Sequence, residues 1–600
     1  MVLTVGVVAA ILVLLVTDKA PPDMAFGAGL IVLLFGGVIS PQEALSGFSN
    51  RGVATVGLLF IVSRAVQNTG VFQVVADRFL GEHDERRGRS RGRLMVRMMV
   101  PVTLLSAVLN NIPLVTIFTP IIKRWAAAQK LPASAFLIPL SYAAIFGGLW
   151  TLIGTSTNLV VHGLLLENDF SGFAFFELAK VGIPVTAVGY VYLATAGRHL
   201  LPDRHDVLSD LSEEPKEYFI EMLVPEGSPL IGKTVEQARL RNLQGVYLTD
   251  IERQGTHLGP VTPDRRLAPG DRLFFAGRTD GVADVVSMNG LVPVDEQTLV
   301  EDTAEIRRYL VEVVISDSAP VVGHTIRDYN FRSEYDAAVV AVSRNGQRVQ
   351  SRLGDVELAP GDTLVLLTRN GFAGRYQYSR DFYLVSSLER ITPEARRKGG
   401  LAALTVLAMV MFAAIGAQLP EIAGTRIDMF YAAAAAAMVL VFARTISAGQ
   451  ARDAIRWDVL LTIGAAFGVS RALINSGVAQ VAGDGIVALL GPLGVVGGLA
   501  AVVVLTLVFT EIITNNAAAA LMVPVAIATA TELGVEAFPF FVAVAVGASA
   551  SFATPIGYQT NLIVQGPGGY RFRDFVRVGL PLDVLVVVTA VASLSFWYVG

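Results

Sequence analysis

Paired asparagines interrupt two long apolar stretches of this 600-residue chain. Asn110-Asn111 lies in the apolar stretch 95–122, and Asn515-Asn516 lies in 490–529. An amide without a partner is costly in hydrocarbon, so each pair either caps a broken helix end or binds a ligand. Asparagine oxygens and free backbone carbonyls suit a hard cation such as sodium, and exposed helix N-termini attract an anion. The two pairs therefore predict sites for a cation and an anion, with helix capping as the alternative.

A second kind of polar interruption follows each pair. Residues 147–158 and 549–561 are dense in Gly, Thr, Pro and Asn, although they lie inside apolar spans. This composition predicts an unwound helix, which frees carbonyls for a cation and amides for an anion. A surface of small residues between helices is the alternative. It explains the glycines, but not the Thr-Asn pair that ends both segments, Thr157-Asn158 and Thr560-Asn561.

The elements that carry these residues occur twice, about four hundred residues apart. Val62-Ser63-Arg64-Ala65 returns as Val469-Ser470-Arg471-Ala472, and Thr157-Asn158-Leu159 returns as Thr560-Asn561-Leu562. The asparagine pairs occupy the same place in the order. A duplicated unit in an apolar protein predicts a transporter whose binding site lies between the two copies.

The composition is that of a membrane protein with a soluble insert. Hydrophobic residues make up 53% of the chain and charged residues 16%, against about 25% charged residues in soluble domains. The charge-poor parts are 1–200 and 400–600. The predicted membrane spans are 2–17, 24–39, 53–69, 134–161, 180–198, 400–417, 427–444, 457–474, 538–564 and 578–598, with re-entrant hairpins at 95–122 and 490–529.

Several function classes are excluded by missing residues. The sequence has no cysteine and a net charge of only −4, which excludes thiolate metal sites and disulfides. No G-x-x-x-x-G-K-[ST] loop is present, so a nucleotide-driven pump is not predicted. We expect no enzyme and no nucleic-acid partner.

The distribution of lysine and arginine predicts the orientation. Loop 73–98 carries seven arginines, whereas loops 163–178 and 530–538 carry no basic residue. These counts predict that the N- and C-termini lie outside and the insert lies in the cytoplasm. The predicted location is the cell inner (plasma) membrane. Five spans per copy then force the copies into opposite orientations. The predicted fold is membrane α-helical, an inverted repeat of five spans plus a re-entrant hairpin each.

The insert is itself duplicated. Leu267-Ala268-Pro269-Gly270-Asp271 recurs as Leu358-Ala359-Pro360-Gly361-Asp362, each before an apolar run. Alternating apolar residues and Gly-Asp turns predict two small α/β domains. The predicted domains are 1–201 and 399–600 for the transmembrane repeats, with 202–298 and 299–398 for the soluble copies.

Asparagine-tipped hairpins, each followed by a broken helix reading Gly-x-x-Thr-Asn, resemble the divalent-anion:sodium symporter family of the ion-transporter superfamily. The resemblance covers 1–200 and 400–600. It implies homodimers that move one dianion, commonly a dicarboxylate, citrate or sulfate, together with Na⁺ by an elevator motion. It implies these ligands for the substrate and ions: Asn110, Asn111, Thr155, Ser156, Thr157, Asn158, Thr514, Asn515, Asn516, Thr554, Pro555, Gly557, Thr560 and Asn561. Sodium would be held by Asn110, Asn111, Asn515 and Asn516.

The tips depart from the family pattern, and the insert has a resemblance of its own. The tips read Leu-Asn-Asn and Thr-Asn-Asn where the family has Ser-Asn-Thr, which puts sulfate slightly ahead of a dicarboxylate. The insert resembles two copies of the TrkA-C (RCK-C) domain of potassium-conductance regulators. That resemblance implies dimerisation and, in some members, a regulatory nucleotide. Neither copy has a G-x-G-x-x-G fingerprint, so no dinucleotide site is predicted, and a dimerisation module without a ligand is the alternative.

Charged residues inside predicted spans are functional candidates. Glu511 could couple transport to a cation or a proton, with helix capping as the alternative; its counterpart by sequence is Ser106. Asp583 is expected at the cytoplasmic interface. Arg64 and Arg471 are expected to snorkel or to pair at a domain interface.

The predicted function is sodium-coupled symport of a small divalent anion. Two alternatives are a sodium/proton antiporter in which Glu511 carries the proton, and a membrane-bound nucleotide sensor.

Overall fold

The computed structural model describes most of the chain outside the loops of the insert. The described residues are 1–17, 19–69, 71, 75, 78, 91–129, 131–204, 217–240, 246–254, 256–258, 261–262, 264–278, 290–293, 310–316, 319–344, 347–349, 353–368, 372–376, 379, 381–386, 393–416 and 428–599. Most of loop 73–98, with three of its seven arginines, lies outside these residues. The predicted boundary between residues 298 and 299 lies outside them as well.

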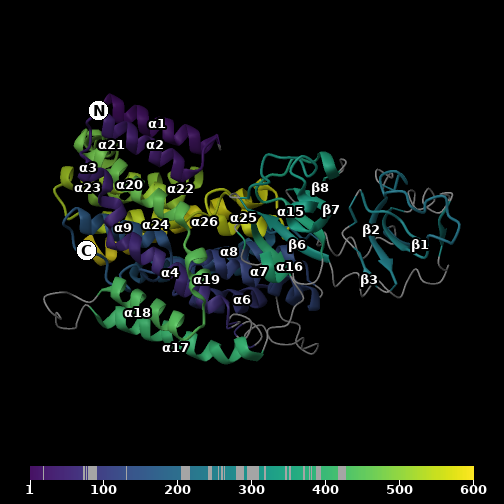
Figure 1. Cartoon of the computed structure of the whole chain (residues 1–600). Coiled ribbons are helices and arrows are strands. Elements are labelled where there is room, and N and C mark those ends of the chain that lie inside the picture. Colours follow the sequence, from purple (N-terminus) through teal and green to yellow (C-terminus); the bar gives the residue numbers. More distant parts are fainter. Residues whose placement is uncertain are drawn as a thin grey trace. The chain divides into compact units, whose positions relative to one another are not determined.

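The chain divides into two compact units (Figure 1). The first contains residues 1–203, 390–564 and 571–600, and the second contains 204–389 with 565–570. Among the described residues, six helices of the first unit are long and apolar enough to cross a membrane. The chain is therefore a multi-pass membrane protein.

The first half of the helical unit is interrupted at the two places that were predicted for it. Its helices are α1 (Val2–Val16), α2 (Pro22–Phe35), α3 (Pro41–Ser46), α4 (Arg51–Gln67), α6 (Arg91–Ser106), α7 (Asn111–Ala128), α8 (Leu137–Gly148), α9 (Ser156–Glu167) and α10 (Ala179–Tyr192). The predicted span 134–161 is thus two helices, and residues 149–155 between them are not helical. The apolar stretch 95–122 is also two helices, which meet at Asn110.

The second half follows the same plan. Its helices are α17 (Pro393–Ile415), α18 (Met429–Phe442), α19 (Ala448–Ala454), α20 (Trp457–Asn475), α21 (Val478–Leu490), α22 (Gly494–Ile512), α23 (Asn515–Glu532), α24 (Phe538–Ser549), α25 (Gln559–Gln565) and α26 (Phe572–Leu594). The hairpin α22–α23 turns at Ile513-Thr514. Residues 550–558 separate α24 from α25 without helical structure.

Two short helices were missing from the predicted spans. Both α3 and α19 begin with a capping box, in which Ser40 pairs with Glu43 and Ser447 pairs with Gln450. A capping box satisfies two backbone amides that the first helical turn leaves without partners. It explains how six or seven residues hold a helix that hydrophobicity alone does not reveal.

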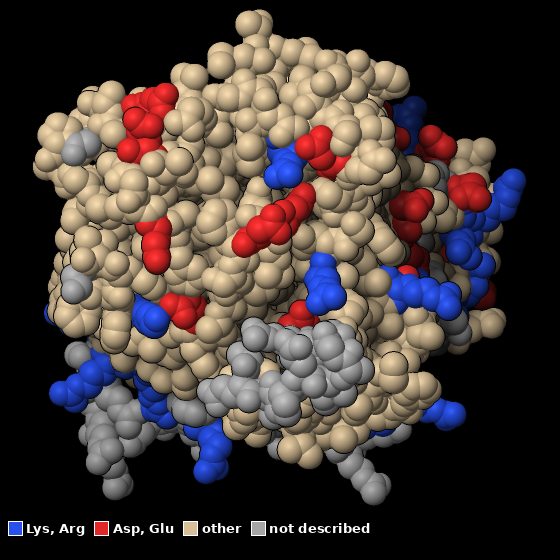
Figure 2. Space-filling model, turned by 90° about the vertical axis from the view of Figure 1, so that its left-hand side faces the viewer, with Lys and Arg blue, Asp and Glu red and all other residues tan. Residues whose placement is uncertain are grey.

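The helices that lead into the breaks are the most deeply buried. Every residue of α8 is buried, and so are eleven consecutive residues of α24, Pro539–Ser549. In contrast, α17, α18 and α26 expose large apolar side chains such as Leu404, Phe442 and Val588. The face in Figure 2 is mostly uncharged, with scattered acidic and basic residues. Exposed apolar surface around a buried polar centre is the arrangement expected in lipid.

The second unit contains two five-stranded antiparallel sheets, in the orders β3-β2-β4-β1-β5 and β10-β6-β9-β7-β8. The strands are β1 (Glu217–Leu223), β2 (Val246–Arg253), β3 (Thr256–His257), β4 (Arg272–Arg278), β5 (Val292–Pro293), β6 (Leu310–Ile315), β7 (Ala337–Arg344), β8 (Gln347–Arg348), β9 (Thr363–Thr368) and β10 (Phe382–Ser386).

The repeated Gly-Asp turn has the same role in both sheets. Asp271 accepts two hydrogen bonds from Arg253, at 2.7 and 2.8 Å, and Asp362 accepts two from Arg344, at 2.8 and 2.7 Å. Both carboxylates are buried. The hydrogen bonds to Asp271 raise the pKa of the Arg253 guanidinium.

Candidate functional site

The hairpin tip of each half contacts the broken helix of the other half. The amide of Asn111, at the first tip, lies 2.6 Å from the Tyr558 hydroxyl in the second break. Asn516, at the second tip, accepts hydrogen bonds from Ser156 and Thr157 of α9, both at 3.3 Å. Tyr558 also lies 3.2 Å from Thr155 Oγ1. Residues four hundred positions apart therefore form one connected polar centre.

The orientation of the Asn111 amide follows from its neighbours. It is buried between Ser106 Oγ at 2.5 Å and Tyr558. With its nitrogen towards Ser106, it can also donate to the carbonyls of Gly154 and Ala144, while its oxygen accepts from Tyr558. This orientation satisfies every donor and acceptor of the amide.

Asn158 and Asn561 stabilise the non-helical backbone of the two breaks through equivalent hydrogen bonds. Asn158 Nδ2 donates to the carbonyls of Gly148 and Thr151, both at 2.9 Å. Asn561 Nδ2 donates to the carbonyls of Ser551 and Thr554, at 3.2 and 3.0 Å. Each asparagine thus binds the carbonyls ten and seven residues before it. Their nitrogens are used structurally, which leaves their oxygens for other partners.

The side-chain oxygens of Asn158 and Asn561 have different surroundings. Asn561 Oδ1 accepts from Ser141 Oγ of α8 at 2.6 Å, and the same hydroxyl lies 2.8 Å from Thr560 Oγ1. Asn158 Oδ1 is buried and has no hydrogen-bond partner. A buried oxygen without a partner is costly, and here it belongs to a predicted ligand.

Hydrogen bonds at the hairpins correct the sequence alignment by one residue. Ser106 Oγ donates to the Ala144 carbonyl and contacts Asn111. In the same way, Thr510 Oγ1 donates to the Ala548 carbonyl and lies 3.1 Å from Asn515 Oδ1. Asn111 therefore corresponds to Asn515, and the predicted match of Asn111 with Asn516 is wrong.

The same correction changes the counterpart of Glu511. Thr151 Oγ1 donates to the carbonyl of Ala107, and Thr554 Oγ1 donates to the carbonyl of Glu511 at 3.2 Å. Ala107, and not Ser106, thus occupies the place of Glu511 in the first half.

Some of the remaining predicted ligands have local structural partners. Asn110 caps α7 by accepting from the backbone amide of Ile112 at 3.2 Å, which is the capping alternative. Thr514 begins α23 without a side-chain cap, and its buried Oγ1 has no partner. Thr554 Oγ1 accepts from the Gly557 amide at 3.0 Å. Pro555 and Gly557 are buried in the second break. Asn110 and Ser156 line one cavity with Ser63 and apolar neighbours.

Tyr558 and Ser141 are site residues that the predicted ligand set missed. Tyr558 connects Asn111 to Thr155, and Ser141 connects α8 to Thr560 and Asn561. Tyr558 lies inside the predicted break, and its polar side chain was the available signal. Nothing in the sequence around Ser141 indicated its distant partners.

The two acids in the second half are both largely enclosed. Glu511 Oε1 accepts from the Ala553 amide at 3.0 Å, and its Oε2 is buried without a partner. Asp583 is only 3% exposed. Asp583 is therefore buried in the protein, and its place near the cytoplasmic end of the last span stays a prediction.

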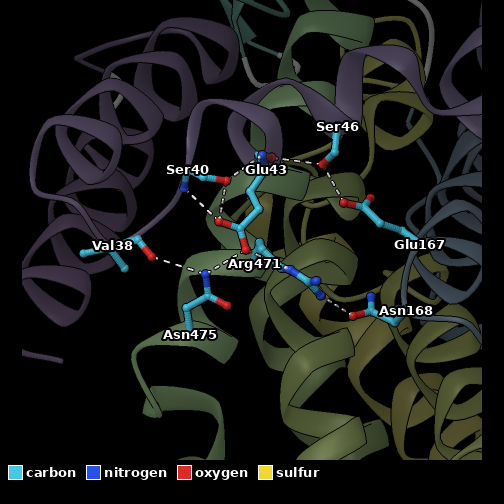
Figure 3. A network of polar contacts seen from close by, with 8 residues as sticks. All are labelled: Val38, Ser40, Glu43, Ser46, Glu167, Asn168, Arg471 and Asn475. Carbon is cyan, nitrogen blue, oxygen red and sulfur yellow. Dashed lines mark hydrogen bonds and ion pairs between the residues drawn. The ribbon is translucent and has the colours of Figure 1, made fainter.

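A polar network fixes the far end of α9, whose first turn lies in the site (Figure 3). Arg471 of α20 pairs with Glu43 at 3.3 Å and donates to Asn168 at 3.1 Å. Ser46 donates to Glu167 at 2.5 Å. Arg471 thus joins α20 to α3 and to the end of α9, and α9 is anchored at both ends.

Comparison with known proteins gives one family and several full-length relatives. The model of the CitMHS family, described as citrate transporter, matches residues 12–547. A Chlamydomonas reinhardtii protein named putative sulfur deprivation response regulator is 34% identical over 95% of this chain and 97% of its own length. An uncharacterized transporter of Synechocystis is 32% identical over 98% and 95%. Sodium/sulfate cotransporter 1 of Chlamydomonas reinhardtii is 26% identical over 96% and 88%.

Proposed function

The chain belongs to the CitMHS citrate transporter family, and on this premise we propose that it couples sodium to the uptake of a small divalent anion, with sulfate ahead of a dicarboxylate. Membership confirms the prediction of an anion transporter and not an enzyme. Sodium and sulfate are supported by the name of the relative called sodium/sulfate cotransporter 1.

One observation carries the proposal. The tip of each hairpin bonds to the broken helix of the opposite half, through Asn111 with Tyr558 and through Asn516 with Ser156 and Thr157. A centre built from both halves lets a ligand hold them together. This is the place expected for the binding site of a carrier built from two repeats.

The chemistry of the centre suits an anion that enters together with cations. None of the predicted ligands is charged; they offer amides, hydroxyls and the first turns of helices. Helix N-termini favour negative charge, but neutral donors alone only partly replace the water around a dianion. Sodium ions bound to neighbouring oxygens would supply the missing positive charge, and this makes anion binding depend on sodium.

The architecture belongs to the same proposal. The shared hydrogen bonds of the two halves support a duplicated unit. We propose that the copies are inverted, that they carry the substrate by an elevator motion, and that the chain is a homodimer. The two sheets of the second unit would be cytoplasmic TrkA-C-like domains that assemble the dimer, with or without a regulatory nucleotide.

Uptake into proteoliposomes tests this function. Labelled sulfate, succinate and citrate are each offered under an inward sodium gradient, and then under a potassium gradient of equal ionic strength. We expect sulfate to accumulate only with sodium. Asn516→Ala should reduce uptake to the level of empty liposomes. Gln480→Ala, which changes an exposed amide on α21, is the matched control and should transport normally.

A sodium/proton antiporter is the second candidate, because two acids, Glu511 and Asp583, lie enclosed in the second half. In that case no labelled anion accumulates, while an imposed pH gradient drives sodium flux. This result would reject the symporter.

A further inference from the structure

Two carboxylates in the second half lie next to the break between α24 and α25. Glu511 is near the end of α22, and Asp583 is on α26. Glu511 Oε1 accepts from the Ala553 amide at 3.0 Å. Gly579, about one turn before Asp583 on α26, packs against the backbone of Phe552. Asp583 is 3% exposed, and neither of its oxygens makes a hydrogen bond of normal geometry.

Further oxygen atoms lie near these carboxylates. Glu511 Oε2 and the Ser551 hydroxyl are buried without a hydrogen bond of normal geometry, and both residues lie against Gly557. The hydroxyl of Tyr192 donates to the Val578 carbonyl of α26 at 2.8 Å. Two carboxylates enclosed without a cation would be strongly unfavourable.

The first half shows the same place filled by an apolar side chain. There Ala107, Trp150 and Thr186 occupy the positions of Glu511, Ala553 and Asp583. Trp150 Nε1 donates to Thr186 Oγ1 at 2.8 Å, and this hydroxyl donates to the Gly182 carbonyl at 2.7 Å. The indole N–H and the Thr186 hydroxyl thus satisfy each other's hydrogen-bonding needs.

The geometry points to a sodium site in the second half only, formed by Asp583, Glu511 and the Ser551 hydroxyl, and separate from the hairpin tips. Oxygen atoms without hydrogen-bond partners are the ligands that hard cations take. Ala553 stands where the first half has Trp150.

Such a site would give the two halves different tasks. The tips would bind the substrate together with its sodium ions, while the acid pair would bind an ion that holds α22, the second break and α26 together. The choice of sodium rests on the proposed coupling ion, but the existence of the site does not depend on which anion is carried.

Equilibrium binding of radioactive sodium to the purified full-length chain, without any anion, tests the site. We expect Asp583→Asn, which preserves the shape of the side chain, to lower the number of sodium ions bound per chain by one. Thr186→Ser, at the corresponding place in the first half, is the matched control and should leave that number unchanged.

A second variant keeps the test valid if the single change unfolds the protein. The triple variant Glu511→Ala, Ala553→Trp and Asp583→Thr copies the first half, and it should fold and lose the same sodium ion. An unchanged sodium count in either folded variant would overturn the site, including the case in which the acids share only a proton. A failed sulfate uptake assay with a sodium count that still falls by one would reject the proposed substrate and leave this site standing.

Discussion

The two halves of the helical unit share a framework and differ in the chemistry that it encloses. Asn158 and Asn561 close the breaks through the same pair of carbonyl contacts. Behind the first break, Trp150 donates to Thr186; behind the second, Glu511 and Asp583 lie enclosed. Contacts that fix the backbone of the breaks are thus kept in both copies, whereas the side chains packed next to the breaks have diverged. This difference separates structural residues from candidates for ion coupling.

The largest expected effect is on the contacts that join the halves. Asn111→Ala and Asn516→Ala should each reduce sulfate uptake to background, because each removes the only tip amide that reaches the opposite break among the contacts described here. Uptake into proteoliposomes checks this, with gel filtration as the control for assembly. Full uptake by one of the two variants would show that the halves do not contribute equally.

The two sheets provide a comparison in which the copies are alike. Arg253→Met and Arg344→Met each leave a buried carboxylate without its partner, which should cost about 3 kcal/mol of folding free energy in the affected sheet. Hydrogen exchange of β2 and β7 in the full chain measures the loss. The matched double variant Arg253→Met with Asp271→Asn should recover most of it. Unequal losses of folding free energy would show that the two ion pairs do not stabilise their sheets to the same extent.

The contacts of Asn158 and Asn561 should contribute unequally to the free energy of unfolding. Asn561→Ala removes the amide bonds to Ser551 and Thr554 and the bond from Ser141, and should lower the free energy of unfolding by about 2 kcal/mol. Asn158 lacks a partner for its oxygen, so Asn158→Ala should cost only about 1 kcal/mol. Thermal unfolding in detergent compares them. A larger loss for Asn158→Ala would mean that its oxygen has a structural role.

The smallest effect is expected at the network on α9. Arg471 and Glu43 are partly exposed, at 36% and 28% of their side-chain surface, and such pairs contribute about 0.5 kcal/mol. Arg471→Gln should lower stability by that amount in low salt, and by less at high ionic strength, which screens exposed charges. Arg471→Lys should retain most of the stability. A loss independent of salt would assign the effect to packing.

The sequence predicted the interruptions because their cause is local. Asparagine, glycine and proline inside an apolar span are costly wherever they lie, so the breaks at 149–155 and 550–558 could be read directly. The partners across the centre could not. Ser141 and Tyr558 reach residues more than four hundred positions away, and no local pattern encodes such contacts.

The alignment of the two tips could not be settled from the sequence. Matching Asn110-Asn111 to Asn515-Asn516 by identity placed the second tip one residue late, because the register is defined by the hydroxyls of Ser106 and Thr510. The burial of Asp583 could not be predicted either, because it depends on packing between distant segments.

Protection of residue 156 by bound substrate tests most directly whether the anion binds where the two halves meet. The natural chain has no cysteine, so Ser156→Cys introduces a single thiol beside Asn516. Sulfate with sodium should slow its labelling by a water-soluble thiol reagent, whereas sulfate with potassium should not, and labelling of the exposed control Gln480→Cys should not change. If sulfate, succinate and citrate all fail to protect Ser156→Cys in the presence of sodium, the anion does not bind where the two halves meet, and the account is contradicted.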